Sequence, residues 1–148
     1  MTRILITGSR DWDNVNAVKG TLGMVQNLVE GPSEAYPDGD EPFVILHGGC
    51  PTGADKIAAD IIAAPNRITG EPPYKPKWDR YGRFAGPLRN QAMIDTRPDF
   101  VLGFLNPCRK GPDCVRYRHE GEHWSHGAQD CADRAIKTGI TTLLTFGR

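Results

Sequence analysis

The sequence lacks any apolar run near the about 18 residues of a membrane-spanning helix, and it lacks the basic and then apolar start of a secretory signal. It also lacks net charge, because 18 Lys and Arg balance 18 Asp and Glu. Without an overall basic field, nothing draws the whole chain to nucleic acid or to an anionic membrane, so any anion site must be local. We therefore expect a cytoplasmic protein whose partner is a small molecule rather than a membrane or a nucleic acid.

Cysteine is scarce and internal repeats are absent. Four cysteines in a cytoplasmic protein are more often thiols or metal ligands than disulfides. The 148 residues have the length of one domain, and their composition is that of an ordinary globular core. Glycine and proline, by contrast, are abundant, with 17 and 12 residues. We expect a single domain, 1–148, whose many loops carry the function.

Short apolar or β-branched runs alternate with stretches of helical periodicity along the whole chain. Alternation of this kind predicts right-handed crossovers and a parallel sheet covered on both faces, which is a Rossmann-like α/β three-layer sandwich with strand order 3-2-1-4-5. An acidic, Pro- and Gly-rich surface loop is expected over 31–42. The expected strands are 3–7, 43–46, a short edge strand within 65–77, 100–105 and 141–146; the expected helices are 15–29, 52–62, 87–96 and 128–136.

Three glycine-bearing turns each follow an expected strand or open an expected helix: Gly8–Arg10, Gly48–Gly53 and Ser125–Ala128. Glycine lets the backbone approach an anion closely, and the helix that follows points unpaired N–H groups at it. In the expected strand order, strands 1 and 4 flank the switch point where ligands bind, so all three turns face one crevice.

Each turn has a structural reading beside the ligand-binding one. Gly8 can simply end a strand, yet Ser9 offers a hydroxyl and Arg10 a fork of donors suited to phosphate. In the second turn Thr52 and Asp55 are spaced as helix caps, and Asp55 can also accept a ribose hydroxyl. This turn lacks the Lys-Ser/Thr ending of a P-loop, so Walker-type hydrolysis of a magnesium nucleotide is not expected.

A basic and aromatic segment precedes and opens the 87–96 helix. Arg80 and Arg83 belong either to a solvated loop or to the crevice. Arg89 lies near a helix start, where the dipole disfavours a cation unless an anion offsets it, so we place it and Asn90 in the crevice. Trp12 and Trp78 either stack a base or pack in the core. The candidate ligand-binding residues are Gly8, Ser9, Arg10, Trp12, Gly48, Gly49, Thr52, Gly53, Asp55, Arg89, Asn90, Ser125, His126, Gly127 and Ala128.

Three stretches that carry these residues resemble the YspA-like, or cpYpsA-related, branch of the SLOG superfamily: 4–12 (ILITGSRDW), 47–55 (HGGCPTGAD) and 78–93 (WDRYGRFAGPLRNQAM). The resemblance covers almost the whole chain, with the motifs in the right order. It implies a Rossmann-like fold that binds a nucleotide or nucleotide-derived ligand, and it makes a homodimer plausible. Relatives are common in phages and bacteria, and include the distantly related LONELY GUY phosphoribohydrolases and the SLOG sensor domains of conflict systems.

The third turn bears on catalysis. By the resemblance, LONELY GUY enzymes use an acidic residue a few positions after a Gly-Thr pair. Here Ala128 replaces the Thr, Cys131 stands at the acidic position, and Asp130 is adjacent. We expect a binding or sensing module with no required cofactor. The alternative is a nucleotide hydrolase that cleaves an N-glycosidic or phosphate bond, with Asp130 and Asp55 as candidate catalytic residues.

An insertion at 106–125 carries a second chemistry. Cys108, Cys114, His119 and His123 offer two thiols and two imidazoles, enough for a tetrahedral structural zinc, although the spacing is not a standard one. The segment has too few apolar residues to build a core, so a metal would explain its order. The alternative is a polar surface loop. We expect His126 to contact the ligand and Cys131 to be a core thiol.

Overall fold

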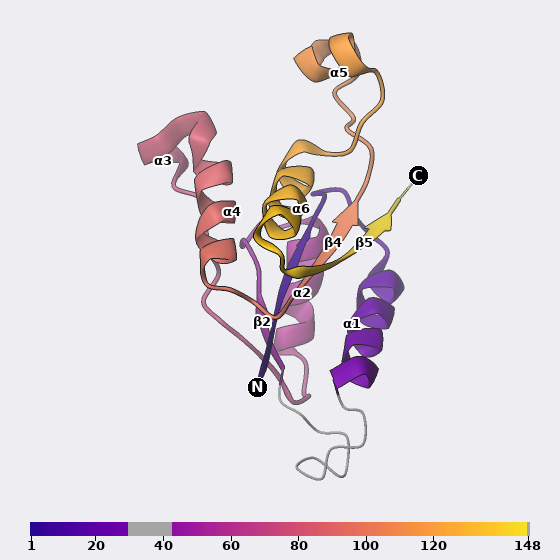
Figure 1. Ribbon diagram of the computed structural model, residues 1–148, viewed down its shortest axis with the longest axis vertical. Helices are drawn as coiled ribbons and strands as arrows, with labels where there is room; N and C mark the ends of the chain where they lie inside the picture. The colour runs from indigo at the N-terminus through magenta and orange to yellow at the C-terminus, as the bar shows by residue number, and fades with distance from the viewer. Residues whose placement is uncertain (30–42, 148) are drawn as a thin grey trace.

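A computed structural model gives the fold, and it describes residues 1–29 and 43–147 (Figure 1). The expected 31–42 loop lies outside the described residues. Strands and helices alternate from the first residues to the last. In chain order the elements are β1 (Thr2–Gly8), α1 (Val15–Val29), β2 (Phe43–Leu46), α2 (Gly53–Ala63), β3 (Ile68–Gly70), α3 (Trp78–Tyr81), the 3-10 turn η1 (Gly82–Phe84), α4 (Ala85–Asp95), β4 (Phe100–Leu105), η2 (Gly111–Asp113), α5 (Val115–Glu120), α6 (His126–Thr138) and β5 (Thr141–Phe146).

The strands form one five-stranded parallel sheet in the order β3-β2-β1-β4-β5, which confirms the predicted topology. Ile4 on β1 pairs with Ile45 of β2 on one side and with Phe100 of β4 on the other. After β1 the chain crosses to one face of the sheet, and after β4 it crosses to the opposite face. The switch point predicted from the sequence therefore lies between β1 and β4.

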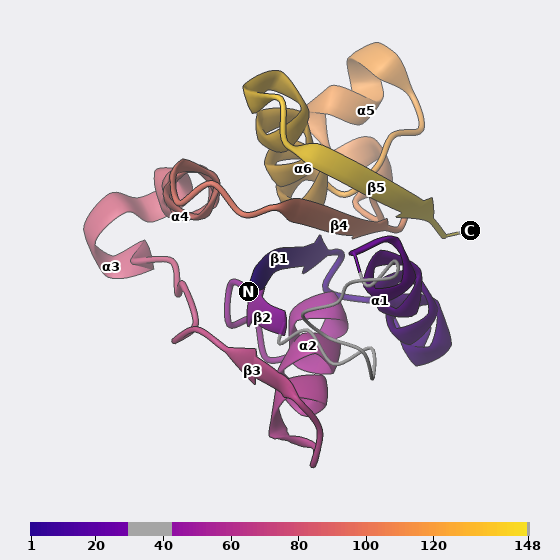
Figure 2. The ribbon, with the colours of Figure 1, turned by 60° about the horizontal axis from the view of Figure 1, so that its bottom comes forward.

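Side chains alternate across the sheet and build a core on each face. Figure 2 shows α1 and α2 on one side of the sheet and α4 and α6 on the other. Ile4 and Ile6 face α1 and α2, whose apolar stripes include Val18 and Ile57. Leu5 points the other way, toward the apolar sides of α4 and α6. Two helical layers thus enclose the sheet, as expected for a Rossmann-like three-layer sandwich. No helix within 1–29 or 43–147 has the length and apolar character needed to cross a membrane.

Local capping chemistry explains several of the element ends. Asn14 caps α1, because its Oδ1 accepts the N–H of Ala17. Gly139 ends α6 in the left-handed conformation with φ of 84°, as its position predicted. The prediction that Thr52 caps α2 is wrong, since Thr52 makes no side-chain cap hydrogen bond. The helix predicted from Pro87 begins at Ala85 instead.

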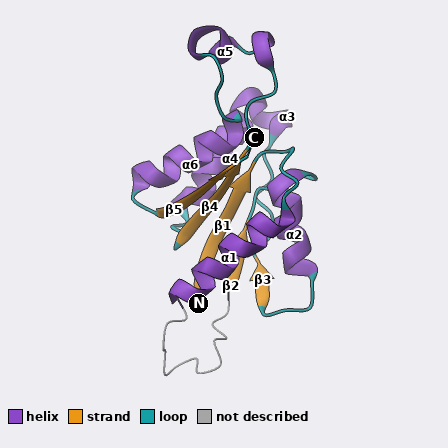
Figure 3. Ribbon diagram, turned by 90° about the vertical axis from the view of Figure 1, so that its right-hand side faces the viewer, coloured by secondary structure: helices purple, strands orange, loops and turns teal. Residues whose placement is uncertain are grey.

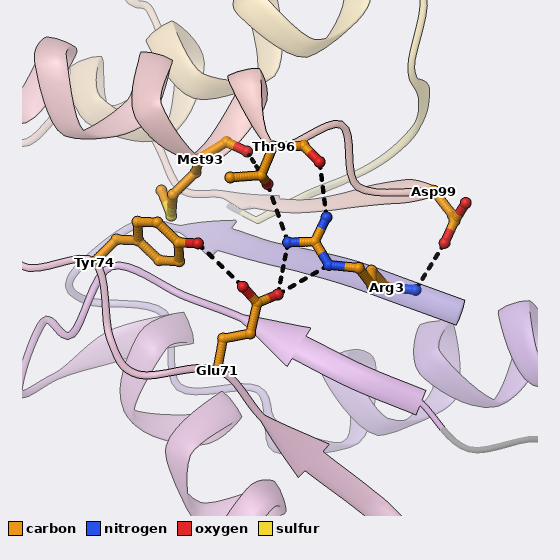
Figure 4. A network of polar contacts seen from close by, with 6 residues as sticks. All are labelled: Arg3, Glu71, Tyr74, Met93, Thr96 and Asp99. Atoms are coloured by element: carbon orange, nitrogen blue, oxygen red, sulfur yellow. Dashed lines mark hydrogen bonds and ion pairs between the residues drawn. The ribbon is translucent and has the colours of Figure 1, made fainter. Parts of the chain in front are cut away.

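A polar network ties the sheet to α4 on the face that carries Leu5 (Figure 4). The Arg3 guanidinium donates to the Glu71 carboxylate from Nη2 at 2.6 Å and to the Thr96 carbonyl at 2.8 Å. Tyr74 donates its hydroxyl to the other Glu71 oxygen at 3.1 Å, and the Arg3 N–H donates to Asp99. Every donor drawn in this network has a partner, so the network fixes the segment after the short edge strand β3 against the body of the domain.

The carboxyl ends of the strands meet at one edge of the sheet, and the insertion extends from this edge. Figures 1 and 3 show α5 standing away from the sheet and from the helices that cover it. An isolated antiparallel bridge between Pro107 and Trp124 closes the base of the insertion. The edge therefore carries the three glycine turns and the insertion together.

Candidate functional site

Ser9 joins three chain segments at the switch point. Its Oγ accepts the N–H of Asn106 at 2.7 Å and shares a hydrogen bond with the Oγ of Ser125 at 2.5 Å. Its carbonyl accepts the N–H of Ala54 at the start of α2. The side chain is buried, with 2% of the residue exposed. Ser9 thus fastens the end of β1 to the end of β4 and to the residue that precedes α6.

Gly53 shows how tightly α2 is docked on this turn. Its φ is 72°, and a Cβ placed there would lie 2.2 Å from the Ser9 carbonyl oxygen. Gly8 is equally confined, because a Cβ would lie 2.6 Å from both the Ala54 Cβ and the Phe104 carbonyl oxygen. The first and second turns therefore need glycine at these two positions for close packing.

Two groups beside Ser9 and Ser125 remain open to a ligand. Arg10 is exposed and makes no hydrogen bond or ion pair with another described residue. The N–H groups of His126, Gly127 and Ala128, at the start of the 13-residue α6, meet no acceptor within the described chain. Ser125, at the N-cap, turns its hydroxyl to Ser9 and leaves them uncapped. Along the chain, Arg10 follows Ser9 and the positive end of the α6 dipole follows Ser125, so both groups are next neighbours of the Ser9–Ser125 contact.

The second turn uses its N–H groups inside the protein. The Gly49 N–H donates to Nδ1 of His47 at 3.0 Å, and the Cys50 N–H donates to Oδ2 of Asp55 at 3.1 Å. The Gly48 N–H also interacts with the Asp55 carboxylate. This turn is therefore internally satisfied and does not form an anion-binding nest from these three groups, although its side chains still border the edge.

Burial shifts the pKa of both side chains that accept these N–H groups, His47 and Asp55. His47 is 5% exposed, and burial lowers its pKa; the neighbouring Arg89 acts in the same direction, while Asp55 opposes both. Burial raises the pKa of Asp55, although the N–H of Cys50 and the Arg89 guanidinium favour the carboxylate. Because Nδ1 of His47 accepts from Gly49, the neutral ring carries its proton on Nε2.

Arg89 and Asn90, adjacent residues of α4, hydrogen-bond to the second and third turns. Nη1 of Arg89 donates to the Gly48 carbonyl at 2.7 Å and to the Tyr74 carbonyl at 3.2 Å. Asn90 is buried and donates from Nδ2 to the Gly127 carbonyl at 3.2 Å. The hydrogen bonds of these two residues hold the second and third turns in place. Contacts within the protein therefore explain the positions of both side chains without a bound ligand.

Asp130 is already paired. Its Oδ2 accepts from Nδ2 of Asn90 at 2.9 Å and from Nε of Arg134 at 2.8 Å. The hydrogen bond from Arg134 raises the pKa of that guanidinium. A carboxylate engaged by two donors is held in place, and it serves to orient Asn90 under the third turn.

The two candidate tryptophans, Trp12 and Trp78, differ in their exposure to solvent. Trp12 is 6% exposed, packs on Phe104 with ring centroids 5.4 Å apart, and donates from Nε1 to the Asn14 carbonyl. The expectation that Trp12 stacks a ligand base is therefore corrected: its ring belongs to the core. Trp78 is 48% exposed at the start of α3. Arg80 and Arg83 stack over the rings next to them in sequence and match the solvated-loop alternative.

Four side chains of the insertion and of α6 converge on one point: Cys108, Cys114, His123 and His126. Their ligand atoms all lie within 4.8 Å of one another. The Cys114 sulfur is 3.3 Å from Nε2 of His126 and 3.5 Å from Nε2 of His123, and the two Nε2 atoms are 2.8 Å apart. Tetrahedral zinc with thiolate and imidazole ligands needs separations of about 3.3 to 3.8 Å, so a small adjustment fits this set around a metal such as zinc.

The surroundings of the cluster favour the metal-binding forms of its ligands. Nδ1 of His123 donates to the Gly121 carbonyl at 2.8 Å, which leaves the Nε2 lone pair facing the other ligands. Burial acts to raise the pKa of Cys114, but the N–H donors of Tyr117 and Arg116, together with the side chains of His123 and Cys108, lower it overall. Burial also lowers the pKa of His126, and the cations of Arg116 and Lys110 lower it further.

One predicted ligand is replaced. His119 lies outside the cluster, on α5, and His126 takes its place as the second imidazole. The reason is the chain path: the Cys108 N–H donates to the His123 carbonyl at 2.7 Å, and the Ser125 N–H donates to the Asn106 carbonyl at 2.9 Å. This pairing brings the first residue of α6 back beside Cys114, whereas His119 on α5 is not among the four converging side chains.

Sequence reasoning missed two residues and misread a third. His47 belongs to the second motif, and its position directly after the buried strand β2 is the signal for a site-facing side chain. Asn106, directly after β4, carries the same signal; its Nδ2 donates to Asp11 at 3.0 Å. His126 was assigned to the ligand because it lies in a glycine turn. The available clue is that His126 lies only three residues after His123, near enough in the chain for both imidazoles to reach one metal ion.

The chain is similar to the "Gene 61 protein" of Mycobacterium phage D29, with 31% identity over 151 residues that cover 99% of this chain and 98% of the relative. No family model matches the chain. No solved structure matches it either. The fold and the two sites are therefore interpreted from the residues themselves.

Proposed function

Because this chain belongs to the family of the Gene 61 protein, a name that states no activity, we propose its function from its own residues. It is a binding or sensing module that takes the phosphate of a nucleotide or nucleotide-derived ligand at the carboxyl edge of its sheet. We assign it to the YspA-like branch of the SLOG superfamily on the motifs of the first and second turns.

One observation carries the proposal. The Ser9–Ser125 hydroxyl contact joins the residue before Arg10 to the residue before the uncapped start of α6, and Arg10 makes no hydrogen bond or ion pair with another described residue. A guanidinium and open helix N–H groups are the donors that phosphate prefers, and a switch point in a parallel sheet is where such ligands bind. The anion thus belongs between the first and third turns, while the second turn shapes the side of the site.

Binding is favoured over hydrolysis. Cleavage of an N-glycosidic bond needs a carboxyl group free to act on the leaving base. Asp130 is engaged by Asn90 and Arg134, and Asp55 is buried and holds the turn at Cys50. Both candidate catalytic carboxylates are therefore used in keeping the turns in place.

The test is calorimetric titration with the monophosphates of the four ribonucleosides, with the four nucleosides as controls that lack the phosphate. We expect binding of at least one nucleotide and much weaker binding of its nucleoside. Chromatography of the same mixtures checks for released base or phosphate. Absence of binding by every phosphate compound would overturn the proposal, and turnover would support the hydrolase alternative.

We also propose that the metal of the Cys108, Cys114, His123 and His126 cluster is zinc and that its role is structural. Two thiolates and two imidazoles form a closed tetrahedral set with no position left for substrate. Between residues 107 and 125 of the insertion, Cys114 is buried and every other residue is at least partly exposed. The insertion therefore has no apolar core to stabilise it. A metal supplies the missing stabilisation.

Elemental analysis of chelator-free protein tests this assignment, with about one zinc per chain expected. His126→Ala should lose most of the zinc, and His119→Ala, a matched histidine outside the cluster, should keep it. Retention of zinc by His126→Ala together with its loss in His119→Ala would return the site to the ligand set predicted from sequence. Less than about a tenth of an equivalent in the wild type, with no thermal shift on adding zinc, would remove the metal altogether.

A further inference from the structure

We propose that zinc at the Cys2His2 cluster regulates the phosphate site, so that metal occupancy and ligand affinity are thermodynamically linked. This inference rests on the proposed function. It concerns the region where the two sites share a segment of chain, residues 123–128, and it assigns His126 a role through the metal rather than through contact with the ligand.

The shared segment is short and contains members of both sites. His126 is a cluster member and also the first residue of α6, and the next two residues, Gly127 and Ala128, supply open N–H groups of the phosphate site. On its other side lies Ser125, whose hydroxyl meets Ser9. A metal on Nε2 of His126 therefore fixes the first turn of α6 at the place where an anion would bind.

The other ligands anchor that turn to the rest of the edge. Cys108 lies just past the end of β4, and its N–H bonds the His123 carbonyl. Arg109, the next residue, pairs with Asp11 in the loop after β1 at 3.2 Å. A metal shared by Cys108 and His126 thus ties the start of α6 to the ends of both β4 and β1.

Loss of the metal removes this constraint. The first turn of a helix has few hydrogen bonds of its own, so it frays when external ties are released. Frayed N–H groups must be ordered again when an anion binds, and this ordering weakens the affinity. By linkage, bound anion must strengthen zinc binding by the same factor.

The experiment titrates zinc-loaded and zinc-free protein with inorganic pyrophosphate by calorimetry. Pyrophosphate is chosen because the base of the natural ligand is unidentified. Zinc content is measured again after each titration, and circular dichroism checks that the zinc-free form keeps its helices and sheet. We expect affinity to fall about fivefold or more without zinc, the lower range of typical couplings between sites.

His126→Cys separates the role of the metal from direct contact. A thiolate can replace the imidazole as zinc ligand, so this variant should retain zinc and near-wild-type affinity for pyrophosphate, whereas His126→Ala should lose both. His119→Ala is the matched control and should behave as wild type. If the zinc-free form loses its fold, zinc release from the loaded wild type into a chromogenic chelator, slowed by pyrophosphate, provides the second measurement.

The outcomes are distinguishable. Equal pyrophosphate affinity with and without zinc in folded protein, or release that pyrophosphate does not slow where the zinc-free form unfolds, overturns the linkage and leaves the phosphate site standing. Weak binding by zinc-loaded His126→Cys points to the imidazole as a direct ligand contact and also overturns it. No binding by any zinc-loaded form, together with none by nucleotides, overturns the proposed function itself.

Discussion

The hydroxyls of Ser9 and Ser125 lie 116 positions apart in the sequence and 2.5 Å apart in the fold. The contact joins the turn after β1 to the residue before α6, the helix that leads from β4 and the insertion to β5; β1 and β4 are the strands that flank the switch point. Because Ser9 also accepts the N–H of Asn106, one buried side chain sets the relative position of three segments. The phosphate site proposed above depends on this junction.

Ser9→Ala should destabilise the fold. The change leaves the buried N–H of Asn106 without its acceptor, and such a loss costs about 1 to 3 kcal/mol. The free energy of unfolding from urea titration measures the effect. Ser125→Ala, at a half-buried position, removes only the second partner and should cost less. A Ser9→Ala variant as stable as wild type would show that water replaces the hydroxyl at no cost.

Arg10→Ala should weaken phosphate binding by about 1.5 to 3 kcal/mol with little change in stability, because a charge-assisted hydrogen bond to the anion is lost while no hydrogen bond or ion pair to another described residue is broken. Calorimetry with pyrophosphate gives the affinity, and urea unfolding gives the stability. The control is Arg83→Ala, which removes an exposed guanidinium stacked on Phe84. Equal affinity in Arg10→Ala and wild type would contradict the placement of the anion.

His47 should make stability depend on pH. Burial lowers its pKa from the usual 6.5, so the unfolded chain binds a proton at a higher pH than the folded chain does. The folded state therefore loses stability as pH falls from about 6.5 down through the lowered pKa. Zinc-loaded His47→Asn should lose less stability between pH 7 and pH 5 than wild type. His119→Asn serves as the control, and identical slopes in all three proteins would refute the effect.

Asp130→Asn distinguishes a binding module from a hydrolase. In a binding module the change should leave nucleotide affinity within a few fold, since Asp130 only orients Asn90 and pairs with Arg134. Some stability should be lost, because an amide is a weaker partner for a guanidinium. Calorimetry and product chromatography are the measurements. Release of free base by wild type, abolished in this variant with binding intact, would establish the enzyme.

The fold was predictable because apolar runs and helical stripes alternate so regularly. The apolar run Phe100–Leu105 predicts β4, Gly139 marks the end of α6, and the run Thr141–Phe146 that follows it predicts β5. A pattern of strand, helix and strand leaves few topologies once crossovers are right-handed. The strand order followed from that rule together with the choice of a switch point between strands 1 and 4.

The site was less predictable, because side-chain partners depend on tertiary contacts. The glycine turns were found, but nothing local shows that the N–H groups of Gly49 and Cys50 would be used by His47 and Asp55. The sequence leaves open whether Trp12 packs in the core or stacks on a ligand, and its packing on Phe104 decides for the core. His119 and His126 likewise differ only in where the chain turns after Cys114.

The bridge between Pro107 and Trp124 brings the two ends of the insertion together at a narrow neck. When the two ends of a segment already lie together, replacing, lengthening or shortening the segment puts little strain on the sheet, because the chain enters and leaves the segment at the same two points. The insertion is therefore a suitable place for grafting. A short hairpin turn in place of the residues between Pro107 and Trp124 would give a shortened domain, and a fluorescent tag inserted at the same place would report on the carboxyl edge of the sheet.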